Sequence, residues 1–189
     1  MKERPILFSG PMVRAILEGR KTQTRRIVKV NEAGQWVCHA VRSCLNPEES
    51  WQRDVMASEC PYGKPVDRLW VREAWCHYDL WRPGPNGYGR ICYRASGDEP
   101  IASFSNVKPD RWRPSIHMPR WASRITLEVV SVRVERLQDI SAKDAIAEGC
   151  CDPTSSTPKR AFEWLWKSIN GPGSWEANPW VWVVEFRKL

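Results

Sequence analysis

The sequence predicts an α+β fold, a mixed β-barrel with a few short helices and long loop insertions. Three observations lead to this class. The chain opens with a strand, a helix and a second strand within its first 30 residues. Residues 123–137 alternate almost perfectly between apolar and polar side chains, which is typical of a strand. An aromatic strand is expected at residues 180–186.

The N-terminal unit leads into a basic turn. Residues 5–9 predict a short strand, residues 11–18 a helix and residues 24–30 a second strand rich in β-branched side chains. A proline near the first turn and Gly19 at the end mark the limits of the helix. The chain therefore changes direction at Gly19.

The middle of the chain predicts two insertions in one domain that spans residues 1–189. Residues 31–65 contain a short candidate strand and otherwise loop chemistry. Residues 78–120 are rich in Pro, Gly and Asn around a candidate strand at 90–94. Between the insertions, residues 68–75 alternate as in a core strand.

Two helices are expected near the C-terminus. Residues 140–149 predict one of them, with Ser141 as the N-cap, Asp144 three residues later and Gly149 as the end. Residues 162–169 predict the other.

Residues 19–26 read Gly-Arg-Lys-Thr-Gln-Thr-Arg-Arg and form the first candidate site. Lys21 and Thr24 can converge on one point in a turn that leaves a helix. Cationic neighbours lower the pKa of an amine and attract anions, and here they are Arg20, Arg25 and Arg26. A lysine that is held close to neutral can act as a base. A solvated basic turn is the alternative interpretation.

Glu148 is unusual because its carboxylate lies in the last turn of the predicted helix. The negative end of the helix dipole disfavours a carboxylate there unless a cation lies nearby. Lys21 or a neighbouring arginine is a candidate for that cation, and an ordinary surface carboxylate is the alternative.

Charge and aromatic content indicate a phosphate-bearing ligand. The net charge is +7, and the excess lies in residues 1–30 and 108–136. Most of the 12 tryptophans are expected to fill the core. The interleaved arginine and tryptophan residues of 111–121 suit either core and turn packing or base stacking. The candidate binding residues are Arg20, Arg25, Arg26, Trp70, Arg72, Glu73, Trp112, Ser115, His117 and Trp121.

The sequence has seven cysteines, an odd number, and contains neither a secretory apolar stretch nor an apolar run of membrane length. We therefore expect a soluble cytoplasmic protein. Two Cys-His pairs occur, but no spacing closes a tetrahedral zinc site. We therefore expect no metal and no cofactor.

Four segments together resemble the ASCH domain, a family similar to the PUA fold. They are the Gly-x-Lys-Thr-x-Thr-x-Arg pattern after the first helix, Asp67-Arg-Leu-Trp-Val-Arg-Glu, the helix that ends in Glu148-Gly, and the closing aromatic strand. Val66 departs from the family, which commonly has Gly before this Asp, and we expect it to affect a turn rather than the proposed chemistry.

The resemblance implies a function, because small bacterial ASCH proteins act as N(4)-acetylcytidine amidohydrolases. Their threonine, lysine and glutamate correspond to Thr24, Lys21 and Glu148 as the implied catalytic residues. The implied substrate is N(4)-acetylcytidine or a related N-acylated nucleoside.

RNA binding or cleavage of single-stranded RNA is the alternative function, because other ASCH members are described in these ways. The expected partner is a modified nucleoside or single-stranded RNA, not a membrane. Protein partners are left open. A nucleoside enzyme should be largely indifferent to salt, whereas an RNA binder should lose affinity as salt rises.

Overall fold

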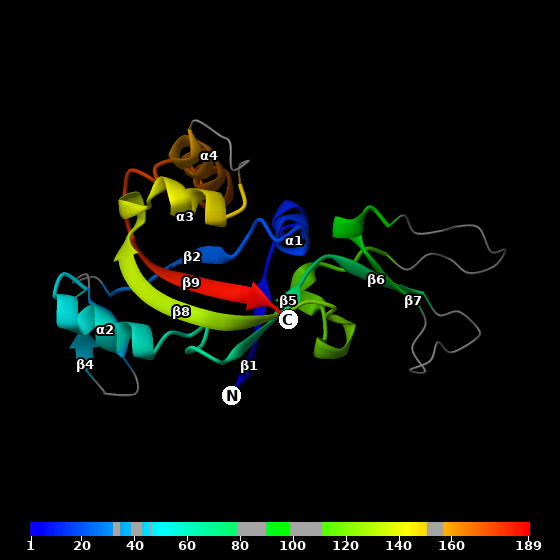
Figure 1. The fold of residues 1–189 in the computed structure, drawn as a ribbon, viewed down its shortest axis with the longest axis horizontal. Helices are drawn as coiled ribbons and strands as arrows, with labels where there is room; N and C mark the ends of the chain where they lie inside the picture. The colour runs from blue at the N-terminus through cyan, green and yellow to red at the C-terminus, as the bar shows by residue number, and fades with distance from the viewer. Residues whose placement is uncertain (32–34, 39–42, 46, 79–89, 99–110, 151–156) are drawn as a thin grey trace.

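A curved five-stranded sheet forms the centre of the protein (Figure 1). β1 runs parallel to β5, and the other neighbouring pairs are antiparallel. In spatial order the strands are β1 (Glu3–Leu7), β5 (Arg68–Arg72), β8 (Thr126–Arg136), β9 (Trp180–Lys188) and β2 (Gln23–Ile27). The computed structural model describes residues 1–31, 35–38, 43–45, 47–78, 90–98, 111–150 and 157–189.

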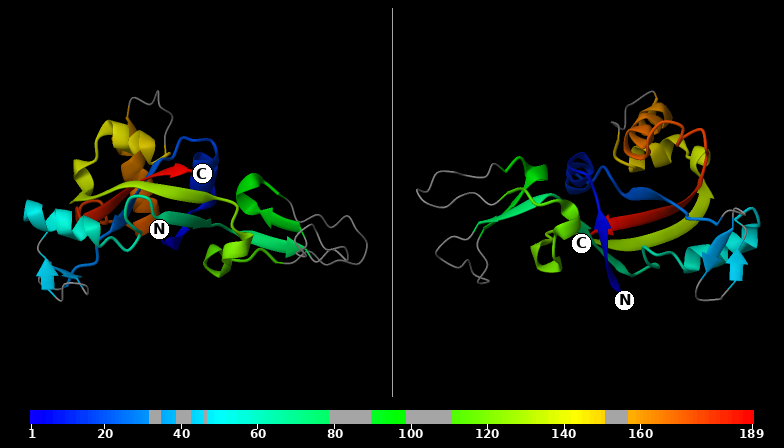
Figure 2. Two further views of the ribbon diagram at one scale, coloured as in Figure 1. Left: turned by 60° about the horizontal axis from the view of Figure 1, so that its bottom comes forward. Right: turned by 180° about the vertical axis from the view of Figure 1, so that it is seen from behind.

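Helices and two hairpins surround this sheet. In Figure 1 α1, α3 and α4 lie above the sheet, next to β2, and α2 lies below it, beside β4. The hairpin of β6 and β7 projects away from the sheet, as two further views show (Figure 2). The bounds are α1 (Gly10–Leu17), α2 (Ser50–Ser58), α3 (Ala142–Ala147), α4 (Pro158–Asn170), β3 (Trp36–Cys38), β4 (Ser43–Leu45), β6 (Trp75–Tyr78) and β7 (Arg90–Tyr93). Short 3-10 helices span Arg94–Ser96, Ser115–His117, Arg120–Ala122 and Leu137–Asp139.

β9 is buried on both faces and separates two apolar cores. Trp182, Val184 and Phe186 belong to the larger core, which also contains residues of α1 and α2. Val181 and Val183 face the other way, into a smaller core formed with α3 and α4. Because alternate residues of a strand point to opposite faces, the unbroken apolar run from Trp180 to Val184 anchors β9 between the two cores.

The expected barrel is not closed among the described strands, because β1 and β2 are the two edges of the sheet. A side chain joins these edges instead of a ladder of backbone hydrogen bonds. The guanidinium of Arg26 on β2 donates to the carbonyl of Leu7 at the end of β1, over 2.6 Å. The fold is therefore an open mixed sheet with helices, and the barrel part of the prediction is not supported.

Most of the expected elements are present. β8 and the alternation of β5, with Leu69 and Val71 opposite Trp70 and Arg72, follow the sequence pattern. Ser141 caps α3 and exchanges hydrogen bonds with Asp144 in a capping box, as its spacing predicts.

α2 was not predicted. It lies inside the insertion at residues 31–65 and places Met56 in the larger core. None of the described helices is long and apolar enough to cross a membrane.

Candidate functional site

The basic turn after α1 is held by the ends of two helices. The backbone N–H groups of Arg20 and Lys21 both donate to the carbonyl of Ala15 in α1, over 2.9 and 3.0 Å. The N–H of Thr22 donates to the carbonyl of Ala147 at the end of α3, over 2.9 Å. These bonds satisfy helix carbonyls that would otherwise lack a partner, and they fix where the Lys21 side chain begins.

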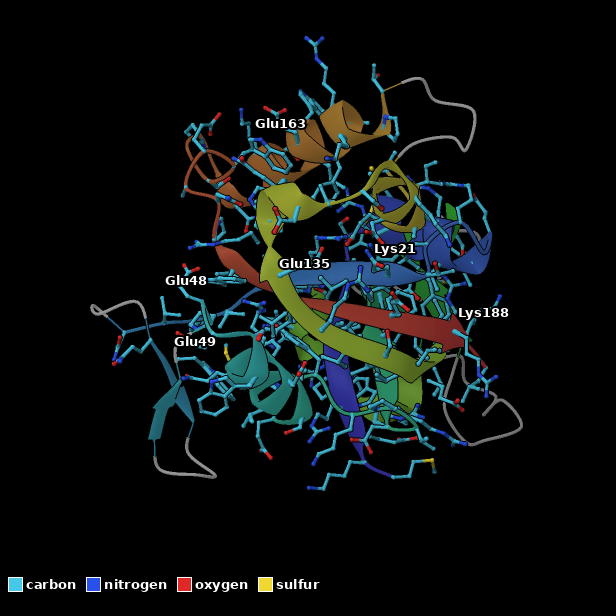
Figure 3. The ribbon with its side chains drawn as sticks, turned by 60° about the vertical axis from the view of Figure 1, so that its left-hand side comes forward. Lys21, Glu48, Glu49, Glu135, Glu163 and Lys188 are labelled. Atoms are coloured by element: carbon cyan, nitrogen blue, oxygen red, sulfur yellow. The ribbon has the colours of Figure 1, made fainter. Side chains whose placement is uncertain are left out.

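Lys21 is buried and bonded to Glu148 twice. Its Nζ donates to the backbone carbonyl of Glu148 over 2.9 Å and to the carboxylate Oε2 over 2.8 Å. The two residues are 4% and 3% exposed. Figure 3 labels Lys21, which lies near the end of α1 beside β2. Lys21 is thus a cation that compensates the carboxylate at the end of α3.

The pKa of Lys21 is lowered from its ordinary value of 10.5. Burial is the main cause, because it disfavours the charged ammonium, and the charge of Arg26 acts in the same direction. The charge and the hydrogen bond of Glu148 oppose the shift without cancelling it. The neutral amine is therefore more accessible at Lys21 than at an exposed lysine.

Arg25 holds the other oxygen of Glu148. Its guanidinium donates to Oε1 of Glu148 over 3.1 Å, pairs with Glu135, and lies 3.6 Å from the Asp144 carboxylate. It also lies over the ring of Phe162, 5.8 Å from the centroid. Both carboxylate oxygens of Glu148 are thus engaged by cations, which fixes the orientation of this side chain.

Gly149 permits the close approach of α3 to the basic turn. Its φ is +74°, a conformation that favours glycine. A Cβ at this position would lie 2.7 Å from the Cβ of Lys21 and 2.9 Å from that of Ala15. No larger residue fits without moving Lys21.

A cavity of about 190 Å³ opens beside these groups. It lies at the free edge of β2, so side chains from both faces of that strand reach it. The predicted site residues that line it are Lys21, Thr24, Arg25, Arg26 and Glu148. The Thr24 hydroxyl receives no hydrogen bond from the described residues, although the side chain is only 4% exposed.

The residues that form the remaining walls of the cavity were not predicted from the sequence. Phe8 follows β1 and contacts two cations, with Lys21 Nζ 5.6 Å and the Arg26 guanidinium 5.3 Å from its ring centroid. α4 supplies Phe162, Leu165 and other residues of the opposite wall. The strong amphipathic pattern of α4 was visible in the sequence, but the groups that it faces are set by tertiary packing.

Arg20 and Arg26 lie in different surroundings. Burial lowers the pKa of Arg26, which lines the cavity. Arg20 does not line it. Its guanidinium pairs with Glu18 and donates to the carbonyl of Gly149 over 3.1 Å, and Arg20 lines a second cavity.

The candidates on and after β5 have other partners. The Arg72 guanidinium stacks on Trp70, 4.6 Å from the ring centroid, and donates to the carbonyl of Ile116 over 3.2 Å. Glu73 is 1% exposed and receives two hydrogen bonds from Arg124, over 2.9 and 3.0 Å. None of these three candidates lines the cavity beside Lys21.

The aromatic-basic stretch lies beside the β6–β7 hairpin. Trp112 packs against Cys76 and Cys92, and Trp121 contacts Trp75 edge-on at 5.7 Å while remaining 48% exposed. Ser115 and His117 bound a 3-10 helix in the same region. The structure does not bring these four candidates to the cavity beside Lys21. The described residues contain no group of three or more His, Cys, Asp or Glu that could hold a metal ion.

Comparison with known proteins gives one structural likeness. No family model matches the sequence, and no curated protein matches it. The structure is similar to the crystal structure of an ASCH domain from Lactobacillus crispatus JV V101, with a TM-score of 0.41 and 9% sequence identity over 99% of this chain and 79% of that chain.

Proposed function

We propose that the protein hydrolyses the amide of N(4)-acetylcytidine or a related N-acylated nucleoside. One observation carries the proposal: a buried lysine of lowered pKa and a buried threonine, whose hydroxyl has no hydrogen bond to the described residues, line the same cavity. Amide hydrolysis needs a nucleophile, a base and a donor for the departing amine, and these two residues supply all three roles.

Lys21 is suited to be the base because of its bonds to Glu148. A neutral amine carries two hydrogens and one lone pair. The two acceptors that Glu148 offers, its carbonyl and Oε2, account for both hydrogens. The lone pair is then left for a proton from another group. Glu148 is the positioning residue that holds the amine in this orientation, and Arg25 holds Glu148.

The reaction proceeds in two steps. The Oγ1 of Thr24 forms a bond to the acetyl carbon while its proton passes to Lys21. The bond from that carbon to the exocyclic nitrogen then breaks, and the Lys21 ammonium returns the proton to the departing amine. Water then forms a bond to the acetyl carbon while one of its protons passes to Lys21. The bond from that carbon to Oγ1 breaks as Lys21 returns the proton to Oγ1, which releases acetic acid and restores Thr24. Arg26 supplies positive charge for the oxyanion of each step.

The size of the cavity favours a small substrate. Its volume of about 190 Å³ is below the roughly 300–1,000 Å³ of typical sites for drug-sized ligands. An acylated base fits this scale better than several nucleotides. The apolar walls from Phe8 and α4 suit the flat face of a base, and Lys21, Thr24 and Arg26 add polar groups to the same cavity.

The first experiment incubates the purified protein with N(4)-acetylcytidine and follows cytidine by chromatography. We expect turnover by the wild type and a loss of at least about 100-fold in Lys21→Ala. Lys29→Ala, which removes an exposed lysine of the same segment, is the matched control and keeps the wild-type rate. A folded wild type without turnover would make RNA binding or cleavage the better proposal, to be assayed with single-stranded oligonucleotides.

A further inference from the structure

We propose that the second cavity binds the nucleotide that adjoins the acylated base, so that the preferred substrate is an oligonucleotide rather than a free nucleoside. This inference rests on the proposed function for the first cavity. It assigns a separate surface, formed by α1, α4 and the residues after α3, to the phosphate and the next base.

The two cavities adjoin. The second one has a volume of about 610 Å³. Four residues line both cavities: Ser9, Met12, Leu165 and Ile169. A ligand whose reactive group reaches Lys21 in the first cavity would extend past these four side chains to reach the second.

The second cavity is electropositive. Arg14 and Arg20 line it from α1 and the basic turn. Lys159 and Arg160 are exposed in the first turn of α4, close in sequence to Ala161, which also lines the cavity. Glu18 pairs with Arg20 and offsets part of this charge. The excess of cations matches the phosphodiester that links a base to its neighbour.

An exposed tryptophan supplies the stacking surface. Trp164 lines the second cavity and is 75% exposed. It is the most exposed tryptophan among the described residues. A large aromatic side chain next to cations provides a face for an unstacked base, and such stacking tolerates any base. This combination favours a nucleotide over an acidic peptide, which would use the cations and leave the ring in water.

The test compares kcat/KM for N(4)-acetylcytidine with kcat/KM for the two dinucleotides that carry the acetylated base on the 5′ or the 3′ side of cytidine. We expect at least about tenfold higher kcat/KM for one dinucleotide in the wild type. In Trp164→Ala the ratio of dinucleotide to nucleoside should fall at least about fivefold. Trp51→Ala removes a tryptophan that is 60% exposed on α2, away from both cavities, and keeps the wild-type ratio.

A binding measurement separates this proposal from the proposed function. The probe is unmodified, fluorescently labelled tetracytidylate, followed by anisotropy at increasing salt. Affinity that falls with salt, and at least about fivefold in Trp164→Ala, supports the nucleotide site even if no substrate is hydrolysed. Equal kcat/KM for nucleoside and dinucleotides, or equal tetracytidylate affinity in the wild type and Trp164→Ala, overturns the second site. Hydrolysis of the nucleoside would still support the amidohydrolase in that case.

Discussion

The ammonium nitrogen of Lys21 bonds to both the backbone carbonyl and the carboxylate of Glu148, a residue 127 positions later in the chain. A carboxylate at the C-terminal end of a helix is unfavourable alone, and a buried lysine is unfavourable alone. Each reduces the penalty of the other. The pair also leaves the lone pair of the neutral amine available to accept a proton, as general base catalysis requires.

Removing the Thr24 hydroxyl should stop the first reaction step. Thr24→Val keeps the shape of the side chain but has no oxygen to attack the acetyl carbon, so we expect turnover of N(4)-acetylcytidine to fall at least about 100-fold. Thr24→Ser keeps the oxygen and should retain measurable turnover. Mass spectrometry of the wild type, quenched during turnover, should show an acetyl group on Thr24.

The control for this prediction is Thr22→Val. Thr22 lies two residues away and is exposed, so the substitution should leave turnover at the wild-type level. If Thr24→Val also keeps wild-type turnover, water and not Thr24 attacks the substrate.

Glu148→Gln should move the pH profile of kcat/KM toward lower pH. The substitution removes the negative charge that raises the pKa of Lys21, while burial and Arg26 continue to lower it. The neutral base is then present at lower pH, although the absolute rate falls because Lys21 is less well held. Glu49→Gln, at an exposed position before α2, should leave the profile unchanged. A shift toward higher pH would contradict the assignment of Lys21 as the base.

The same lowered pKa makes stability depend on pH. Between the lowered pKa of Lys21 and its ordinary value of 10.5, the unfolded chain binds more protons at this residue than the folded chain does. The contribution of Lys21 to the free energy of unfolding should therefore rise with pH across that window. Urea unfolding of the wild type and of Lys21→Met at several pH values measures this contribution. The corresponding rise in the free energy of unfolding should be absent from Lys21→Met.

Gly149→Ala should destabilise the protein and displace Lys21. The new Cβ meets the Cβ atoms of Lys21 and Ala15 at 2.7 and 2.9 Å, in addition to the strain of φ +74°. Gly97→Ala is the matched control, because its φ is +73° and nothing lies within 4 Å of the new Cβ. We expect about 1 kcal/mol loss in the control and roughly 2 to 4 kcal/mol in Gly149→Ala. Equal losses in urea unfolding would show that the close approach is unimportant.

Val66→Gly should stabilise the protein. Val66 has a φ of +77°, which is strained for a β-branched residue, and its side chain is 61% exposed. Relief of the strain should exceed the entropy cost of glycine, raising the free energy of unfolding by about 0.5 to 1 kcal/mol. Val30→Gly, at an exposed position without positive φ, should destabilise instead. A lower melting temperature in Val66→Gly would contradict this account.

Local patterns predicted the elements whose stability is set locally. Alternation over residues 123–137 identified β8, and the Ser141 and Asp144 spacing identified the capping box of α3. α2 was missed because its sequence is polar and only Met56 is buried, so packing on the larger core stabilises it. The expected closure of the sheet is not found among the described strands, and the sequence could not test it because strand patterns do not reveal which strands are edges.

The site was predictable only in part. A misplaced carboxylate at Glu148 indicated a nearby cation, and the structure places Lys21 there. The contacts of Arg25 with Glu135 and Asp144, and the walls from Phe8 and α4, join segments far apart in the sequence. Neither periodicity nor charge runs encode such pairings.

The position of β2 at the sheet edge has a consequence for synthesis of the chain. Its strand partner is β9, the last described strand. A nascent chain that has not yet released residues 180–188 contains Lys21, Thr24 and Glu148 but lacks the strand that pairs with Thr24. The cavity can therefore form only after residues 180–188 have been synthesised, and a chain terminated before them should be inert toward acylated nucleosides.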